Sequence, residues 1–245
     1  MKRTRNSPPE LPPVLAFGAH PDDIEFGCGG VIAVESRKGR RIYFVVCSRG
    51  ESASNGTVSQ RTAEAKRAAQ ILGATLEFVD IGGDAHFQHS LVKALTLAQI
   101  LRRIRPATVL SLAPSENQHP DHAVLGRLVR DAARLARYGG VKEMRNVKPH
   151  AIEHLLFYSV TADAEPADGI PVLIDVSAAQ TLALWKSAME AHASQMKTRD
   201  YVDLQLTRAR LNGLRAGVGH AIALFPADPI VVDSLASLGR GARQF

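Results

Sequence analysis

Short apolar runs alternate with stretches of helical spacing along the first 140 residues of the chain. Residues 14–19 form one such run, and the helical stretches end at glycine or proline, as at Gly73 and Pro106. The predicted strands cover residues 14–19, 41–47, 75–80 and 108–112, and the predicted helices cover residues 29–37, 60–72, 91–105 and 123–138. Four strand–helix units in series predict an α/β fold: a three-layer, Rossmann-like, mostly parallel sheet with helices on both faces.

The last hundred residues are less regular. Residues 153–160 and 171–176 are predicted strands, and residues 178–193 and 204–224 are predicted helices. There is no internal repeat or low-complexity segment, and 245 residues can bury one large core. We therefore expect a single domain over residues 14–245, preceded by a disordered, charged and proline-rich tail over residues 1–13.

Composition narrows the function classes. Lysine and arginine exceed aspartate and glutamate by 30 to 24, but no dense basic patch with interleaved aromatic residues stands out. We expect no nucleic-acid partner, although a mildly basic surface can attract anionic substrates. The two cysteines, Cys28 and Cys47, provide neither a disulfide framework nor a cysteine zinc site, and we interpret them as core residues. No run of 18 apolar residues occurs, so we expect no membrane insertion and a cytoplasmic protein.

Two short polar motifs follow predicted strands: His20-Pro21-Asp22-Asp23 and His119-Pro120-Asp121-His122. Ligands bind at the carboxyl edge of a parallel sheet, where both motifs and the long polar loops at residues 48–59 and 82–90 are expected. A catalytic divalent ion takes three imidazole or carboxylate ligands and keeps one position for water. Each motif supplies a pair of potential ligands three residues apart. The two motifs together predict a metal centre.

Each motif also has a purely structural interpretation. Asp22 or Asp23 could cap a helix that begins near Cys28, and His119 and His122 could be solvent-facing loop residues. Two clusters of histidine and aspartate at corresponding positions of one sheet have little structural purpose together. We therefore favour a metal-binding role for the two motifs.

The motifs also resemble a known family. The run Ala19-His20-Pro21-Asp22-Asp23-Ile24-Glu25, followed by Gly27-Cys28-Gly29-Gly30, and the second motif are similar to the two signatures of the PIG-L/LmbE-like zinc deacetylases. Between them, residues around Arg61 and Glu64 follow the pattern of the bacterial enzymes of thiol biosynthesis, of the bacillithiol type. The resemblance is firm over residues 14–137 and thinner beyond, where His192-Ala193-Ser194-Gln195 is similar to a family helix. It departs at residues 221–225, which lack the glutamate that the family usually carries before its phenylalanine.

The resemblance implies a role for each matching residue. The zinc ligands would be His20, Asp23 and His122, with one zinc ion per chain. Asp22 would be the general base, and a protonated His119 would polarise the acyl carbonyl. Asp121 would orient or charge His119, while Arg61 and Asp84 would contact the sugar.

The expected function is removal of an N-acetyl group from an N-acetylglucosamine-type substrate by a metal-activated water. The substrate could be a free glycoside, a thiol-precursor conjugate, or a nucleotide- or lipid-linked sugar. Alternatives are a deacylase of another amide or ester, a catalytically silent sugar-binding relative, and a non-haem iron enzyme, because two histidines and a carboxylate also describe that site. A homo-oligomer is a further possibility.

Overall fold

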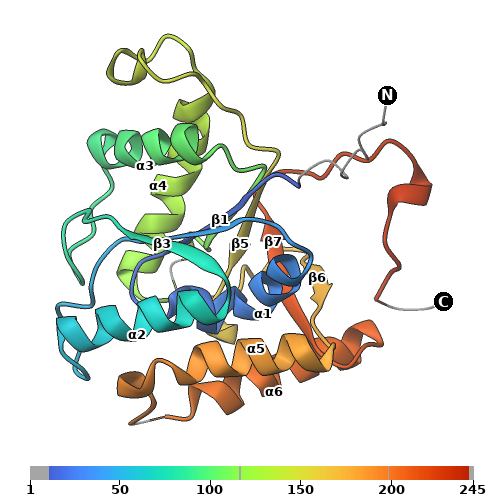
Figure 1. The fold of residues 1–245 in the computed structure, drawn as a ribbon. Helices are drawn as coiled ribbons and strands as arrows, with labels where there is room; N and C mark the ends of the chain where they lie inside the picture. Colours follow the sequence, from blue (N-terminus) through green and yellow to red (C-terminus); the bar gives the residue numbers. More distant parts are fainter. Residues whose placement is uncertain (1–10, 116, 198, 243–245) are drawn as a thin grey trace, which may run out of the picture.

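The computed structural model describes residues 11–115, 117–197 and 199–242, and its centre is one seven-stranded sheet (Figure 1). The strands are β1 (Val14–Gly18), β2 (Ile42–Val46), β3 (Ala74–Phe78), β4 (Thr108–Leu112), β5 (His154–Tyr158), β6 (Val172–Asp175) and β7 (Ala221–Pro226). Their order across the sheet is β3-β2-β1-β4-β5-β7-β6. The first five strands pair in parallel, and β7 is antiparallel to both β5 and β6. The predicted mostly parallel sheet is confirmed.

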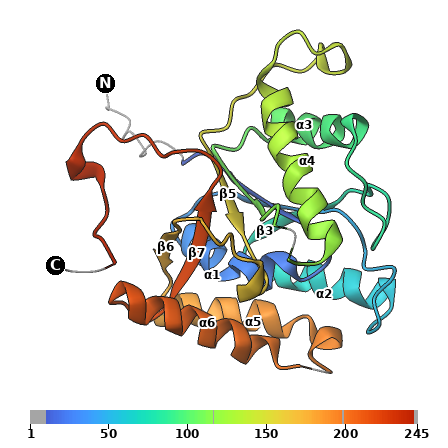
Figure 2. The ribbon, with the colours of Figure 1, turned by 180° about the vertical axis from the view of Figure 1, so that it is seen from behind.

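Helices cover both faces of this sheet. They are α1 (Asp23–Arg37), α2 (Val58–Ile71), α3 (Leu91–Ile104), α4 (Pro120–Arg137), α5 (Ala179–Glu190) and α6 (Tyr201–Ala216). Short 3-10 helices cover Lys142–Met144, Ala162–Ala164, Ala193–Lys197 and Leu235–Ser237. Helices α3 and α4 pack together on one face, and α1, α2, α5 and α6 lie on the other, as the two opposite views show (Figures 1 and 2). The three-layer α/β class is therefore confirmed.

The central strands are apolar because both of their faces are covered. All five residues of β1 are buried, and so are four of the five in β4. Parallel strands between two helical layers need such continuous apolar runs. Cys28 and Cys47 are buried and free, as expected for core residues. None of the helices in the described ranges is long and apolar enough to cross a membrane.

Four helices begin earlier than predicted, and the differences at α1 and α4 fall on the motifs. Helix α1 begins at Asp23 instead of residue 29, and α4 begins at Pro120 instead of residue 123. Glycine has a low helix propensity, so the glycines at residues 27, 29 and 30 made the sequence at the start of α1 look unfavourable for a helix. Proline is favoured in the first helical turn, where its missing N–H costs nothing. The motif side chains therefore project from helix N-termini, not from free loops.

The helix predicted over residues 204–224 is confirmed only as far as Ala216, and its second part is wrong. Helix α6 ends at Ala216, and Gly217 then takes a left-handed conformation with φ +67°. The following apolar residues form β7, which pairs with β5 and β6. A short apolar run fits helix or strand by periodicity alone, and sheet pairing decided between them.

The N-terminal tail is only partly described. Residues 11–13 have neither helix nor strand, and residues 1–10 of the expected disordered tail lie outside the described residues. The single domain over residues 14–245 stays a prediction, although every strand of the described chain joins the one sheet.

Candidate metal centre and active site

The topology brings the two motifs together. Strands β1 and β4 are parallel neighbours, so their carboxyl ends lie on the same edge of the sheet. The chain leaves β1 toward His20 and α1, and it leaves β4 toward His119 and α4. The strand order reverses between β1 and β4, and such a switch point is where open α/β sheets bind ligands.

The three predicted metal ligands converge. His20 Nδ1 lies 3.2 Å from His122 Nε2, and His122 Nε2 lies 3.0 Å from Asp23 Oδ1. His20 Nδ1 lies 3.5 Å from Asp23 Oδ2. The Asp23 carboxylate is fixed, because its Oδ2 accepts hydrogen bonds of 2.8 Å from the backbone N–H groups of both Ala19 and His20.

These separations suit a tetrahedral metal. Zinc–nitrogen bonds of about 2.0–2.1 Å in a tetrahedral site place ligand atoms about 3.3 Å apart. The observed separations of 3.0–3.5 Å scatter around that value. His20 also belongs to two other groups of possible ligands whose atoms lie within 4.8 Å of one another: one with His119 and His122, and one with Asp84 and Asp121. The described residues therefore contain a possible histidine–aspartate metal site centred on His20.

Electrostatics favour a cation at this place. Burial on its own lowers the pKa of His20, but hydrogen bonds to Asp121, Asp23 and Asp84 outweigh burial and raise the pKa to about 12. The side chains of these carboxylates are at most 6% exposed, so water screens them poorly. A divalent ion satisfies the demand for positive charge that this geometry creates.

Asp22 occupies a special position at the start of α1. Its backbone has φ +118°, a conformation rare for a residue other than glycine, and its side chain makes no capping hydrogen bond. Arg61 Nη2 donates to Asp22 Oδ2 at 3.2 Å and to the backbone carbonyl of Pro21 at 2.9 Å. Burial and the charge of Asp23 raise the pKa of Asp22 to about 6, although Arg61 counteracts them. A carboxyl with a pKa near neutrality is suited to accept and release protons.

His119 lies at the pocket mouth as the N-cap of α4. Its ring centroid is 4.7 Å from that of His20 in an edge-on arrangement. Its Nδ1 accepts a hydrogen bond from the backbone N–H of Asp121 at 3.3 Å, so a neutral ring carries its proton on Nε2. Burial and the neighbouring His20 and His122 lower the pKa of His119. This lowered pKa favours a neutral N–H donor over the protonated ring that the resemblance implied.

Arg61 and Asp121 form their hydrogen bonds with other residues of the protein. Arg61 is 4% exposed and binds Asp22 and Pro21. Asp121 accepts from the backbone N–H groups of Ala85 at 2.7 Å and Phe87 at 3.1 Å. Asp121 thereby fastens the loop after β3 to the start of α4.

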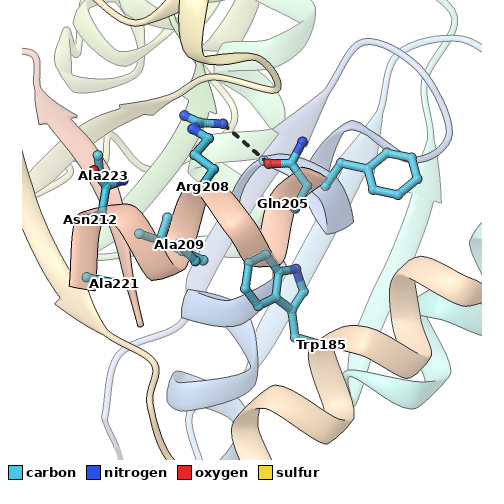
Figure 3. A pocket seen from close by; sticks show the side chains of 10 residues that line it. Trp185, Gln205, Arg208, Ala209, Asn212, Ala221 and Ala223 are labelled. Carbon is cyan, nitrogen blue, oxygen red and sulfur yellow. Dashed lines mark hydrogen bonds between the residues drawn. The ribbon is translucent and has the colours of Figure 1, made fainter. Parts of the chain in front are cut away.

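A pocket of about 310 Å³ opens in front of this cluster. Its lining residues are His20, Asp22, Ser52, Ala53, Ser54, Arg61, Asp84, Ala85 and His119. The volume falls in the usual range for small-molecule sites. A second hollow, between α6, β7 and α1, has only about 10 Å³ (Figure 3). Arg208 and Gln205 border it and share a hydrogen bond, and it holds at most about one water molecule.

Comparison with known proteins agrees with this geometry. A family model described as PIG-L, GlcNAc-PI de-N-acetylase, matches residues 15–133. The chain contains a PIG-L family domain.

Curated relatives of the PIG-L domain carry out different reactions. The chain is 33% identical over 153 residues to 4-oxalmesaconate hydratase of Pseudomonas putida, covering 58% of each chain. It is 29% identical over 157 residues to diacetylchitobiose deacetylase of Thermococcus kodakarensis, covering 59% of each chain. The match thus spans about three fifths of these curated relatives. Among solved structures, a conserved protein of Thermus thermophilus has a TM-score of 0.79 and 28% identity, over 94% of this chain and 100% of that one. Relatives of the PIG-L domain thus include deacetylases and a hydratase, and the family alone does not fix the substrate.

The sequence analysis assigned no role to some residues at or near this site. Ser52 and Ala85 line the pocket from the two long loops, whose position at the strand ends was the only signal. His192 is 1% exposed, and its Nε2 lies 3.4 Å from Glu25 Oε2 behind Asp22. His192 lies 167 residues from Glu25 along the chain, in a stretch without a recognisable metal-binding motif, so only the fold shows this pair.

Proposed function

We propose that this protein is a zinc-dependent hydrolase that removes the N-acetyl group from a small N-acetylglucosamine-type sugar or glycoconjugate. The observation that carries the proposal is the convergence of His20, Asp23 and His122 beside Asp22 in an open pocket. The PIG-L domain and its deacetylase relatives support the same reaction class.

The three ligands would hold one zinc ion, which supplies Lewis acidity: it lowers the pKa of a water molecule and polarises an acyl carbonyl. The donor set of two imidazoles and a carboxylate is typical of hydrolytic zinc sites. Its separations fit that ion, as described above. His20, Asp23 and His122 are therefore the residues that would bind the metal.

Asp22 would act as general base and then as general acid. Its side chain is 14% exposed and lines the pocket, so a water molecule and substrate can reach it. Asp22 would take the proton from the attacking water and later deliver it to the departing amine. A pKa raised to about 6 suits both steps, since the carboxyl is ionised at neutral pH yet releases its proton readily.

His119 would stabilise the carbonyl oxygen as negative charge develops there. Its Nδ1 is occupied by the Asp121 N–H, which leaves Nε2–H as the donor toward the pocket. Loss of one such donor commonly costs about 3 kcal/mol of activation free energy. Arg61, which also lines the pocket, is the proposed sugar contact, and the resemblance implies the same role for Asp84.

Acetate release tests the proposal. Zinc-loaded protein is incubated with a panel of N-acetylglucosaminyl compounds, and acetate is measured. We expect Asp22→Asn to keep zinc and lose at least about a hundredfold in turnover, because it lacks the base. His122→Ala should lose both zinc and activity, and His89→Ala, at an exposed loop position, serves as the matched control. No acetate from any compound, or full turnover by Asp22→Asn, would refute the proposal.

A hydratase is the second candidate, because one relative with 33% identity is a hydratase. The same residues can serve it: a polarised carbonyl activates a conjugated double bond, and Asp22 removes a proton from the added water. Unsaturated dicarboxylic acids would then lose their ultraviolet absorbance in the presence of the protein. Absorbance loss without acetate release would favour this reaction over deacetylation.

A further inference from the structure

The imidazole of His20 is contacted at both nitrogens. Nδ1 faces His122 and Asp23 at 3.2 and 3.5 Å. Nε2, on the far side of the ring, forms an ion-pair contact of 3.0 Å with Asp84 Oδ1 and a hydrogen bond of 3.3 Å with Asp121 Oδ2. If Nδ1 binds the metal, the proton resides on Nε2 and needs an acceptor.

The two neighbouring carboxylates differ in their free capacity. Each oxygen of Asp121 already accepts a backbone N–H, from Phe87 and from Ala85. Asp84 Oδ2 accepts from the Ser52 N–H at 3.1 Å, whereas Asp84 Oδ1 has no partner other than His20 within the described part of the chain. Asp84 Oδ1 is therefore the nearer and the less occupied of the two carboxylate oxygens beside His20 Nε2, and its contact supplements the hydrogen bond to Asp121.

Asp84 is held in place from the neighbouring loop. The Ser52 hydroxyl donates to the backbone carbonyl of Asp84 at 2.9 Å, and the Asp84 N–H donates to Glu51 Oε2 at 3.2 Å. Asp84 is 5% exposed. A buried carboxylate fixed at both its backbone and its second oxygen can fix a ring that binds to the first.

We propose that Asp84 is a positioning residue of the metal centre: beside the hydrogen bond to Asp121, its carboxylate pairs with the Nε2 side of His20 and so keeps Nδ1 turned toward the metal. This inference rests on the proposed metal-dependent function. It assigns the carboxylate a task different from the sugar contact that the resemblance implied. The two roles give different results for zinc binding without substrate.

Zinc affinity of metal-free protein is the deciding measurement. Wild type, Asp84→Asn and Asp84→Ala are stripped with a chelator and titrated with zinc against a chromophoric competitor. Loss of such an outer hydrogen bond commonly weakens metal binding by about 10- to 100-fold. We expect Asp84→Ala to lose that much, and Asp84→Asn, which keeps an uncharged acceptor, to lie between it and wild type.

Asp80→Asn is the matched control. Asp80 lies on the same loop and accepts from the N–H groups of Gly82 and Gly83 at 2.7 and 2.9 Å, where it orders the turn without any contact to His20. Its zinc dissociation constant should equal that of wild type. A shift as large as that of Asp84→Ala would show that loop disorder, not the carboxylate, causes the loss, and would overturn the inference.

Cobalt substitution gives a second readout that does not depend on turnover. The visible absorption bands of bound Co²⁺ report ligand orientation, so we expect them to shift in Asp84→Asn and stay unchanged in Asp80→Asn. Unchanged zinc affinity and cobalt bands in Asp84→Asn, with a raised KM, would overturn the inference in favour of a sugar contact. A wild type that binds no zinc would instead refute the proposed function itself.

Discussion

Helix α1, which begins at Asp23, leaves no room for one additional methyl group at Gly27. A Cβ on Gly27 would lie 2.2 Å from Tyr158 Cδ2 and 2.5 Å from Tyr158 Cε2, although ordinary contact begins near 3.4 Å. Tyr158 is fully buried, and its hydroxyl donates to the Phe17 carbonyl at 2.7 Å. In Gly27→Ala, either the ring or the helix must move by about 1 Å.

The expected change in the free energy of unfolding combines two destabilising effects and one stabilising effect. Overpacking of a filled core costs about 1–3 kcal/mol, and a lost tyrosine hydrogen bond about 1 kcal/mol more. Alanine recovers about 1 kcal/mol through its higher helix propensity. We expect a net loss of about 1–3 kcal/mol in the free energy of unfolding, or about 2–12 °C in Tm for a chain of this length.

Chemical denaturation of metal-free protein measures this loss directly. Gly140→Ala is the control, since a Cβ there would have no atom within 4 Å, and its stability should change by less than about 0.5 kcal/mol. Zinc affinity should fall together with stability in Gly27→Ala, because a displaced α1 carries Asp23 with it. A Gly27→Ala protein as stable as wild type would show that the close packing of α1 on Tyr158 is not as described.

Three further predictions concern the core, pH and metal. Arg102 is 2% exposed, and it donates hydrogen bonds to the backbone carbonyls of Ala136, Tyr138, Met144 and Val147. Arg102→Leu should therefore lower the free energy of unfolding, measured by urea titration, by at least about 3 kcal/mol. A smaller loss would contradict this prediction. Burial lowers the pKa of His192, but the charge and hydrogen bond of Glu25, with Asp22 and Glu64, raise it by more. Since the folded pKa exceeds the unfolded value of 6.5, His192 contributes stability below pH 6.5 that is lost as pH rises through the folded pKa. The stability gap between wild type and His192→Asn should therefore narrow from pH 6 to pH 9, and a widening gap would refute the sign. Zinc at about a hundred times its dissociation constant should add about 2.7 kcal/mol to the unfolding free energy of wild type, and nothing to that of His122→Ala.

The convergence of the proposed metal ligands could be predicted from sequence, because the pattern of these residues is local. His20 and Asp23 are three residues apart, and His122 follows a parallel strand whose end must share an edge with β1. The alternation of short apolar runs and helical stretches gave the strands of the first half for the same reason. Each of these features depends on neighbours in the chain and on rules of strand crossover.

The start of α1 could not be predicted, because its cause lies far along the chain. Gly29 and Gly30 are poor helix formers, and close packing explains them: a Cβ at Gly29 would lie 2.7 Å from the Trp185 ring, and a Cβ at Gly30 would lie 2.7 Å from Ile222 Cδ1. The Trp185 indole also donates to the Glu25 carbonyl at 2.7 Å. Local propensity favoured a loop there, and tertiary packing overrode it.

The contact between Asp84 and His20 was hidden for a different reason. Asp84 lies in a loop with no recognisable motif, 64 residues from its partner along the chain. Its position depends on how two loops fasten to each other through Ser52 and Glu51. Loop geometry of this kind follows from no periodicity.

Asp23 is a proposed metal ligand that also stabilises the turn between β1 and α1, because its Oδ2 accepts hydrogen bonds from the backbone N–H groups of Ala19 and His20. A substitution of Asp23 would therefore disrupt the turn between β1 and α1 together with the proposed metal site. An inactive variant would not show which of these two losses caused the inactivity. A substitution of His122 is therefore the better way to remove metal binding without disrupting the fold around the site.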